Sequence, residues 1–373
     1  MKRQLPRGIT ALSALALASA ACAQSSTVIV FGILDVDLSH YSQNGVSKSI
    51  VSTSGNAPSV IGFRGSEDLG GGLAAHFWLE STITADNGNA AGFSWNRRST
   101  VSLSGAFGEV RLGRDMAPTF LTHGVFDPFK GIGPAAGTNI TLPFLGARAV
   151  GVNAATDARA NNAIEYLWGF APNANAATGK GFYVHVMAAM PENGSGTPAL
   201  GRYAGGRVGY ADDKLNVAFA YARSDGTVTT PGANNGQVTK FKQSNLGVSY
   251  KFDMLTLMGH VGSNDSRLQG TRYAHWGIGA LIAAGPGYIP VAFNSVKQNN
   301  ATSDGASQLA VGYVYELSKR TSLYTNAVRL RNRNSGTYTF VGGNGGGAPA
   351  LTASGLTSPG DGTGFDVGMR HTF

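Results

Sequence analysis

The sequence predicts an all-β protein, a 16-stranded antiparallel transmembrane β-barrel whose long third loop folds into the lumen. Three observations lead to this fold class. The last ten residues, GFDVGMRHTF, alternate apolar with polar or small side chains and end on the aromatic Phe373, as expected for a strand at a membrane interface. Segments with the same two-residue period recur along the chain. The connections between them alternate between tight turns and long polar loops, which is typical of membrane barrels.

The first 23 residues have the pattern of a secretory signal peptide. Basic side chains at Lys2, Arg3 and Arg7 precede an apolar run over residues 9–21, and Ala21-Cys22-Ala23 supplies small residues for cleavage. We expect residues 1–23 to be removed and residues 24–373 to form a single barrel domain. Lipidation of Cys22 is the alternative, but Ser19 lies where a lipoprotein signal prefers leucine. Since Cys22 is the only cysteine, the mature chain has no disulfide.

The composition fits a barrel exposed to lipid on one side and water on the other. Charged residues make up 13% of the chain, and 53 residues are glycine; the first share is about half the usual value and the second about twice. No apolar run after the signal reaches the roughly 18 residues of a spanning helix. Without Lys2, Arg3 and Arg7 the chain keeps 26 basic and 21 acidic residues, a net charge of +5. For an exported protein this surplus indicates anionic lipopolysaccharide or anionic solutes as partners, and no nucleic acid.

Sixteen strands are expected in chain order. The first covers residues 27–41, with Val28, Leu34 and Leu38 on one face and Asp35 and Asp37 on the other. The others are expected at residues 58–66, 72–84, 94–104, 109–115, 160–169, 181–190, 200–211, 214–224, 239–252, 254–264, 271–284, 287–297, 306–317, 320–333 and 362–373. Pairing of the last strand with the first would leave no open edge. A soluble sandwich would also have many short strands, but not this alternation of connections.

Short turns are expected at residues 67–70, 105–108, 212–213, 285–287 and 318–319 and near residue 253, with a medium link over residues 170–180. The longer polar loops are expected at residues 42–57, 85–93, 116–159, 191–199, 225–238, 265–270, 298–305 and 334–361. The loop over residues 116–159 is too long for a hairpin connection. It carries aromatic residues, including Phe120, Phe126 and Phe129, which folding into the lumen would bury. We therefore expect a constriction loop; an extracellular flap is the alternative.

Several stretches resemble the general porins of Gram-negative bacteria, and most closely the betaproteobacterial branch. They are the start at residues 27–37, GFRGSEDLGGGLAAHFWLE from Gly62, FGEVRLGRD from Phe107, RANNAIEYLW from Arg159, and the terminal Phe373. The resemblance implies an outer-membrane homotrimer of sixteen-stranded barrels through which small hydrophilic solutes diffuse without turnover. It also implies acidic residues in the constriction loop, for which Asp127 and Asp157 are the candidates. Phe373 would be the signal read by the barrel-assembly machinery.

The alternation of side chains predicts which arginines face the lumen. Arg64, Arg98, Arg111 and Arg159 take inward positions together with Glu165, where the long loop begins and ends. The sequence also predicts an opposite lumen wall with Arg329, Arg331 and Arg333. Such a ring would favour anions. The alternative is that these arginines pair with Asp35, Asp37, Glu80 or Glu165 and only support the wall.

Catalytic motifs are missing from the sequence. There is no HExxH, GxSxG or phosphate-loop pattern, so we expect no enzyme, no catalytic residue, no cofactor and no metal site. His76 and His260 take inward positions without a predicted role. A substrate-specific channel and a structural or adhesin-like barrel remain the alternatives to passive diffusion.

Overall fold

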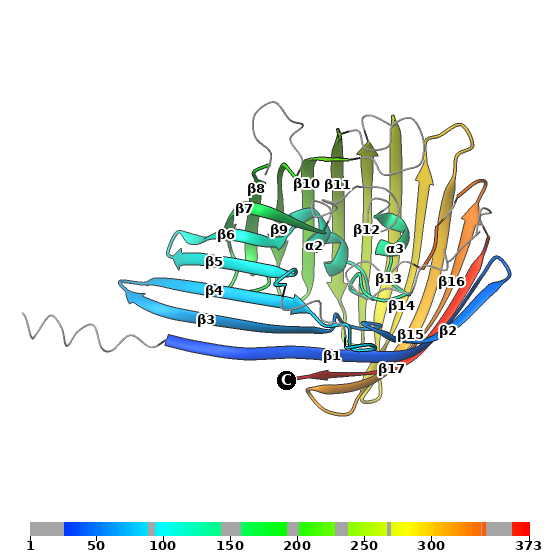
Figure 1. Cartoon of the computed structure of the whole chain (residues 1–373), viewed down its shortest axis with the longest axis horizontal. Coiled ribbons are helices and arrows are strands. Elements are labelled where there is room, and N and C mark those ends of the chain that lie inside the picture. The colour runs from blue at the N-terminus through cyan, green and yellow to red at the C-terminus, as the bar shows by residue number, and fades with distance from the viewer. Residues whose placement is uncertain are drawn as a thin grey trace, which may run out of the picture.

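The computed structural model describes residues 26–88, 94–142, 158–191, 201–227, 238–266, 270–336, 338–340 and 360–373. These residues form one sheet in which every strand pairs antiparallel with its neighbours, and the sheet closes on itself (Figure 1). The predicted signal peptide lies outside the described residues. No helix among them is long and apolar enough to cross a membrane.

The strands agree closely with the predicted ranges. They are β1 (Ser26–Gln43), β2 (Val46–Thr53), β3 (Val60–Gly70), β4 (Leu73–Thr82), β5 (Arg98–Gly105), β6 (Gly108–Met116), β7 (Arg159–Trp168), β8 (Gly181–Ala189), β9 (Tyr203–Ala211), β10 (Leu215–Thr227), β11 (Val238–Lys251), β12 (Leu255–Ser266), β13 (Thr271–Ala284), β14 (Gly287–Gln298), β15 (Gly305–Glu316), β16 (Thr321–Arg333) and β17 (Gly362–Thr372). Two helices, α2 (Pro118–Val125) and α3 (Thr138–Thr141), lie between β6 and β7.

Seventeen strands make a sixteen-stranded barrel because β2 and β3 share one place in the wall. β1 pairs with β2 over Val36–Gln43 and with β3 over Ser26–Ile33, so the two shorter strands lie end to end beside it. The prediction of a polar loop over residues 42–57 was wrong. Asn44 and Gly45 form a tight turn with φ of 50° and 77°, which is the Asn-Gly signal of a two-residue hairpin.

The barrel closes between its first and last strands, as predicted. β1 pairs with β17 from Ile33↔Thr372 to Gln43↔Gly362, and the backbones of Gly32 and Phe373 exchange two hydrogen bonds of 3.0 Å. A Cβ on Gly32 would lie 2.3 Å from the Phe373 ring, so glycine leaves room for the terminal ring to cross β1. The end of β17 lies beside the middle of the long β1 (Figure 1).

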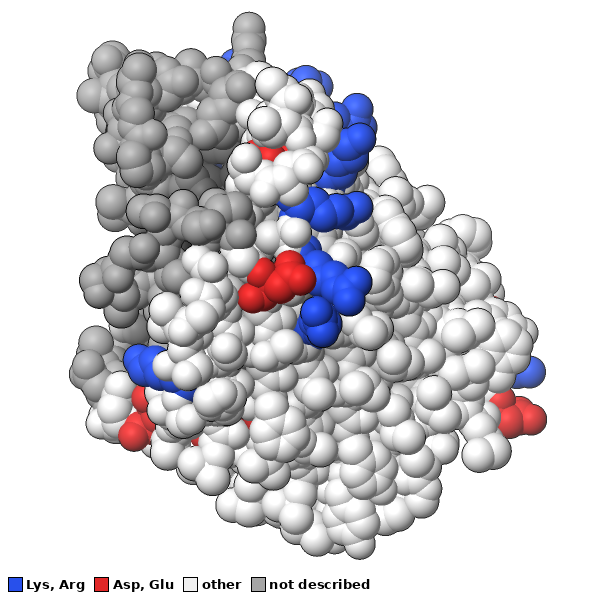
Figure 2. Space-filling view, turned by 90° about the vertical axis from the view of Figure 1, so that its right-hand side faces the viewer, with Lys and Arg blue, Asp and Glu red and all other residues white. Residues whose placement is uncertain are grey.

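Each wall strand has an apolar outward face and a polar or small inward face. On β10 to β13 the exposed side chains include Phe219, Leu246, Val248, Val261 and Trp276. The positions between them are buried glycine, alanine, serine, asparagine and histidine. Figure 2 shows the side of the barrel that lies to the right in Figure 1: a broad uncharged area, with Lys and Arg gathered toward the loop end. This is the pattern of a wall with lipid outside.

The described part of the third loop packs against the inward face of the far wall. From Ala117 to Leu142 every residue is buried except Gly124, Val125 and Lys130. Side chains of three far-wall strands donate to loop carbonyls: Asn245 Nδ2 to Thr119 at 3.0 Å, Asn264 Nδ2 to Thr141 at 2.9 Å, and Gln308 Nε2 to Ala135 and Ala136 at 2.9 Å. These contacts hold residues 117–142 against the inward face of β11, β12 and β15.

Candidate functional site

A dense arginine cluster covers the inward face of β3 to β9. Arg98, Arg111, Arg159 and Arg207 are all at least nine-tenths buried. The ring of Trp78 lies close to two guanidinium groups, those of Arg98 and of the half-buried Arg64, which are 4.3 Å and 5.0 Å from its centre. Stacking on an aromatic face stabilises a partly desolvated guanidinium. The structure places Arg64, Arg98, Arg111 and Arg159 on the inward side that the alternation predicts, and it adds Arg207, which was not predicted.

Carboxylates inside the wall compensate part of this charge. Arg111 Nε lies 2.7 Å from Glu109, and Asp115 lies 3.3 Å from Arg111 and 3.2 Å from Arg98. Arg97 lies just before β5, so the inward–outward alternation of that strand does not fix its orientation. Arg97 Nε lies 2.6 Å from Glu80. Of the acidic partners suggested by the sequence only Glu80 forms an arginine ion pair among the described residues. These buried pairs fix the wall around Arg97, Arg98 and Arg111.

The link over residues 170–180, on the short-turn side, also reaches into the barrel. The carbonyl of Ala174 accepts hydrogen bonds from Arg98 Nη1 at 2.9 Å and Arg111 Nη2 at 2.7 Å. Arg207 Nη1 donates to the Ala177 carbonyl at 2.9 Å, and Asn173 N donates to Glu109 at 3.0 Å. The alternation of strand residues cannot reveal such contacts because backbone carbonyls of a link provide them.

Three cations on the inward side keep contact with solvent. Arg64 on β3 and Arg370 on β17 are half-buried, and Lys130 of the third loop is exposed. Among the described residues none of the three forms an ion pair with a carboxylate. Although the Lys130 side chain keeps contact with solvent, desolvation by the surrounding protein, followed by the nearby charge of Arg370, lowers its pKa. Lys130 also adopts a φ of 56°, a conformation that costs a non-glycine residue of order 1 kcal/mol or more.

Lys130 and Arg370 were missed from the sequence. The Lys130 side chain depends on how the third loop folds, which no strand period describes. Arg370 could have been found, because it shares the inward alternation of Asp366 and Gly368 on β17.

The acidic candidates have different surroundings. Asp127 is 3% exposed, and its carboxylate accepts backbone N–H bonds from Phe129, Gly131 and Gly137 at 2.9–3.1 Å. Burial raises the pKa of Asp127 to about 6, against the opposing effect of these three donors. Glu165 is buried and lies 2.9 Å from His185 Nε2. Asp157 lies outside the described residues.

Comparisons with known proteins agree with this architecture. A family model described as Gram-negative porin matches residues 9–335. The chain belongs to the Gram-negative porin family.

Individual relatives of this porin cover nearly its whole length. Outer membrane porin protein 32 of Delftia acidovorans is 36% identical over 386 residues, covering 99% of this chain and 100% of the relative. A solved anion-selective porin from Comamonas acidovorans matches with a TM-score of 0.76 at 34% identity, over 94% of this chain and all of that one. OmpT of Vibrio cholerae, solved in a trimer form, shares the fold, with a TM-score of 0.63 at 14% identity over 94% and 100% of the two chains. The protein is thus an outer-membrane channel protein, and its family is not an enzyme family.

The prediction that Arg329, Arg331 and Arg333 line the lumen of the porin was wrong. On β16 they share the exposed face with Leu323 and Ala327, whereas Ser322, Tyr324, Asn326, Val328 and Leu330 are the buried, inward positions. The inward–outward alternation runs without a break from Ser322 to Leu330, and continuing it along the strand places the three arginines on the outward face. The apolar residues Val328 and Leu330 point inward here, because they pack in a buried cluster with Phe129 and Ile140 of the third loop.

Basic side chains also form a row on the outward face of the porin, at the loop end of the strands. Cross-strand pairing places Arg223 opposite Lys242, Lys242 opposite Asp265, and Asp265 opposite Arg272. Two further basic residues lie on either side of β15 near the same end of the strands, because Gly305 pairs with Lys297 of β14 and with Arg333 of β16. We call this set the outer basic row: Arg223, Lys242, Arg272, Lys297 and Arg333.

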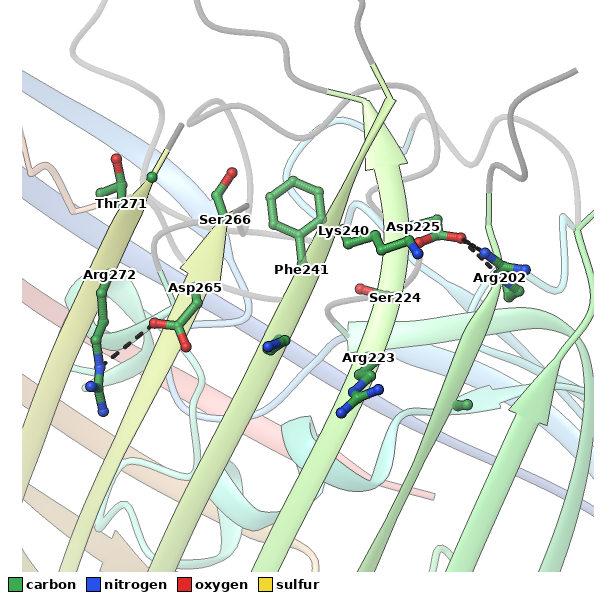
Figure 3. Close-up of a pocket in the computed structure, with 13 residues that line it drawn as sticks. Arg202, Arg223, Ser224, Asp225, Lys240, Phe241, Asp265, Ser266, Thr271 and Arg272 are labelled. Atoms are coloured by element: carbon green, nitrogen blue, oxygen red, sulfur yellow. Dashed lines mark hydrogen bonds and ion pairs between the residues drawn. The ribbon is translucent and has the colours of Figure 1, made fainter. Parts of the chain in front are cut away.

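A hollow of about 750 Å³ lies within this row and is lined by Arg202, Arg223, Lys240, Lys242 and Arg272 with Asp225 and Asp265. Figure 3 shows Arg202 reaching Asp225 and Arg272 reaching Asp265 from neighbouring strands. The two carboxylates leave an excess of positive charge around the hollow.

Proposed function

We propose that this porin is an anion-preferring channel for the passive diffusion of small hydrophilic solutes. The observation that carries the proposal is that three inward cations are exposed to solvent, whereas the described inward carboxylates are not. Arg64, Lys130 and Arg370 reach solvent and form no ion pair with a carboxylate of the described part of the chain, whereas the described inward carboxylates of the strand interiors are buried or paired. A relative of 34% identity is described as anion-selective, which supports the same sign.

The electrostatics of a narrow lumen give this asymmetry its effect. A unit charge about 5 Å from a permeating ion changes its energy by roughly 0.8 kcal/mol in water, and by more where protein displaces water. Each exposed cation therefore changes the local ratio of anions to cations several-fold. The buried Arg98, Arg111 and Arg159, with Glu165, hold the wall in shape around the exposed groups. Glu109 and Asp115 weaken the field of Arg98 and Arg111.

The loop over residues 116–159 serves, in this proposal, as the constriction that brings Lys130 close to the wall. Its packing against the inward face of β11, β12 and β15 supports this role. The acidic component of the constriction is not Asp127, whose carboxylate is used by the loop backbone. Asp157 remains a candidate for that position.

Charge reversal tests the proposed selectivity. We expect Arg64→Glu, Lys130→Glu and Arg370→Glu, each a change of two unit charges, to lower the anion-to-cation permeability ratio by at least about fivefold, measured as the reversal potential of single channels in a salt gradient. Arg331→Glu, on the outward face, is the matched control and should leave the ratio unchanged. Unaltered reversal potentials in all three lumen variants would contradict the assignment. Saturable block by one solute would instead indicate a substrate-specific channel, and a closed pore would favour an adhesin-like barrel.

The remaining features of the porin follow from the family. We propose removal of residues 1–23 on export, with Gln24 as the mature N-terminus, and recognition of the Phe373 strand by the barrel-assembly machinery. We further propose a homotrimer, supported by the trimer form in which a protein of the same fold was solved. Mass spectrometry of the purified chain tests the first point, and migration of unheated samples in detergent gels tests the oligomer.

Lipopolysaccharide is the proposed partner of the outer basic row. The row lies on the outward face directly beyond the apolar residues Tyr221, Leu246 and Trp276, the level at which lipid headgroups begin. Clustered lysine and arginine at this level attract anionic headgroups by about 1 kcal/mol each. Arginine in particular binds phosphate with two hydrogen bonds. The excess of cations over Asp225 and Asp265 makes the hollow suitable for a lipid phosphate.

Lipid retention during purification tests this partner. The triple variant Arg223→Ala, Lys242→Ala, Arg272→Ala should retain several-fold less lipopolysaccharide than the wild type, measured by mass spectrometry of the detergent-extracted protein. The double variant Lys214→Ala, Lys251→Ala alters exposed lysines of the same strands at the short-turn end and should retain the normal amount. Equal retention by all three proteins would exclude the row as the binding surface.

A further inference from the structure

Three buried histidines meet where the third loop contacts the far wall. His123 belongs to α2, His260 to β12 and His275 to β13, and their exposed fractions are 3%, 9% and 2%. The ring centres of His123 and His275 are 4.9 Å apart, and each of the other two pairs is 5.8 Å apart. One ring nitrogen from each histidine lies within 4.8 Å of the others. The two strand histidines come from neighbouring strands, and the third crosses to them from the loop.

The hydrogen bonding of this cluster is incomplete. Both ring nitrogens of His275 and Nδ1 of His260 are buried without a hydrogen-bond partner among the residues that the structure describes. A buried polar atom without a partner costs of order 1–3 kcal/mol. His260 Nε2 lies 3.0 Å from Oδ1 of Asn294 in a hydrogen bond. When the imidazole donates that bond, Nδ1 of His260 keeps its lone pair free, as it does in a metal ligand oriented by a second group.

We propose that His123, His260 and His275 bind one late first-row transition-metal ion, with Zn²⁺ as the reference ion. Imidazole is a preferred ligand of Zn²⁺, Cu²⁺ and Ni²⁺, and three histidines with one open position are an established zinc ligand set in proteins. Zn–N distances of about 2.1 Å place tetrahedral ligand atoms roughly 3.4 Å apart. The rings must therefore approach one another by about an ångström, which small side-chain rotations provide. Water or chloride from the lumen completes the coordination.

Such an ion would clamp the third loop to the barrel. α2 contacts the wall through neutral hydrogen bonds such as Asn245 to Thr119, whereas a metal bound by residues of α2, β12 and β13 would join three elements at one point. Metal binding therefore restricts the opening of α2 away from the wall. The sequence predicted no metal site because His123, His260 and His275 lie far apart in the chain and in no ligand motif.

The binding test uses the full-length porin in detergent. Metal-free protein is titrated with Co²⁺, whose visible absorption intensifies in four-coordinate nitrogen sites, and then with Zn²⁺, which displaces it. We expect one equivalent per chain. His275→Phe and His123→Phe keep a ring of similar size and should each weaken Zn²⁺ binding at least tenfold. His40→Ala and His371→Ala, at exposed histidines, should bind as the wild type does.

Folding of each variant is checked by heat-dependent migration in detergent gels, so that loss of binding in a folded variant counts for the site. No Co²⁺ absorption in the wild type, or unchanged binding in both Phe variants, would overturn the proposal. Hydrogen exchange of the α2 amides tests the clamp. Zn²⁺ should slow their exchange at least tenfold in the wild type and not in His275→Phe. Binding without this slowing would overturn the clamp.

Discussion

Single residues inside this porin separate into those that support the wall and those that meet the solute. Alternation along the strands correctly predicts that Arg64, Arg98 and Arg111 face inward. It does not show that Arg98 and Arg111 are buried by carboxylates and by the carbonyl of Ala174. The exposure of each arginine depends on whether residues 170–180 or the third loop cover it. Those contacts join residues that are far apart in the sequence, so strand alternation does not predict them.

Asp127 gives the third loop a predictable response to pH. The pKa of this carboxyl is about 6 in the packed loop and about 3.9 in an opened one. Because the packed loop holds the proton more tightly, the stability of packing is greatest below pH 4 and declines as the pH rises to about 6. Opening of the loop should increase roughly 10- to 100-fold across this window. Hydrogen exchange of the Gly131 and Gly137 amides, corrected for intrinsic rates, measures it.

Asp127→Asn provides the control for this response. The asparagine side chain does not titrate, so the opening of the loop should lose its dependence on pH between 4 and 6. One of the three accepted hydrogen bonds is also lost, and opening should be more frequent at every pH. A variant whose exchange follows the wild-type pH profile would refute the role of this carboxyl.

At the scale of elements, the strands were predictable and the break in the second strand was not. The two-residue period located the other wall strands within a few residues, because lipid outside and polar groups inside impose the alternation. It failed over residues 46–53, because most side chains of β2 are polar and do not alternate with apolar ones. The polar character of Val46–Thr53 resembles a loop, and only the Asn44-Gly45 turn indicates a hairpin.

The fit between the third loop and the wall depends on glycines of the inward face. A Cβ on Gly247 would lie 1.9 Å from the ring of Phe126 in the loop. We expect Gly247→Ala to displace the loop at a cost of about 1–3 kcal/mol, seen as larger open-channel current fluctuations in bilayer recordings. Gly259→Ala on the neighbouring strand is the control, since its Cβ would meet no atom closer than 3.5 Å. Equal fluctuations in both variants would show that this contact does not hold the loop.

At the scale of the whole molecule, the closed barrel has two separate basic surfaces, one on its inward face and one on its outward face. In our proposal, lysines and arginines at inward positions act on solutes, and those of the outer basic row bind lipid headgroups. The sequence predicted a basic protein, but it assigned Arg329, Arg331 and Arg333 to the wrong surface. The sign of the net charge is therefore a poor guide to selectivity, because cations on the lipid side do not act on the permeating ion.

The central claim is that the lumen of this porin favours anions. The most direct test is the reversal potential of wild-type channels in a planar bilayer that separates concentrated from dilute potassium chloride. The exposure of Arg64, Lys130 and Arg370 predicts a potential whose sign reports chloride as the more permeant ion. It also predicts that the preference weakens as the salt concentration rises, because these groups are screened. A reversal potential of the opposite sign, or one at zero, would contradict the account.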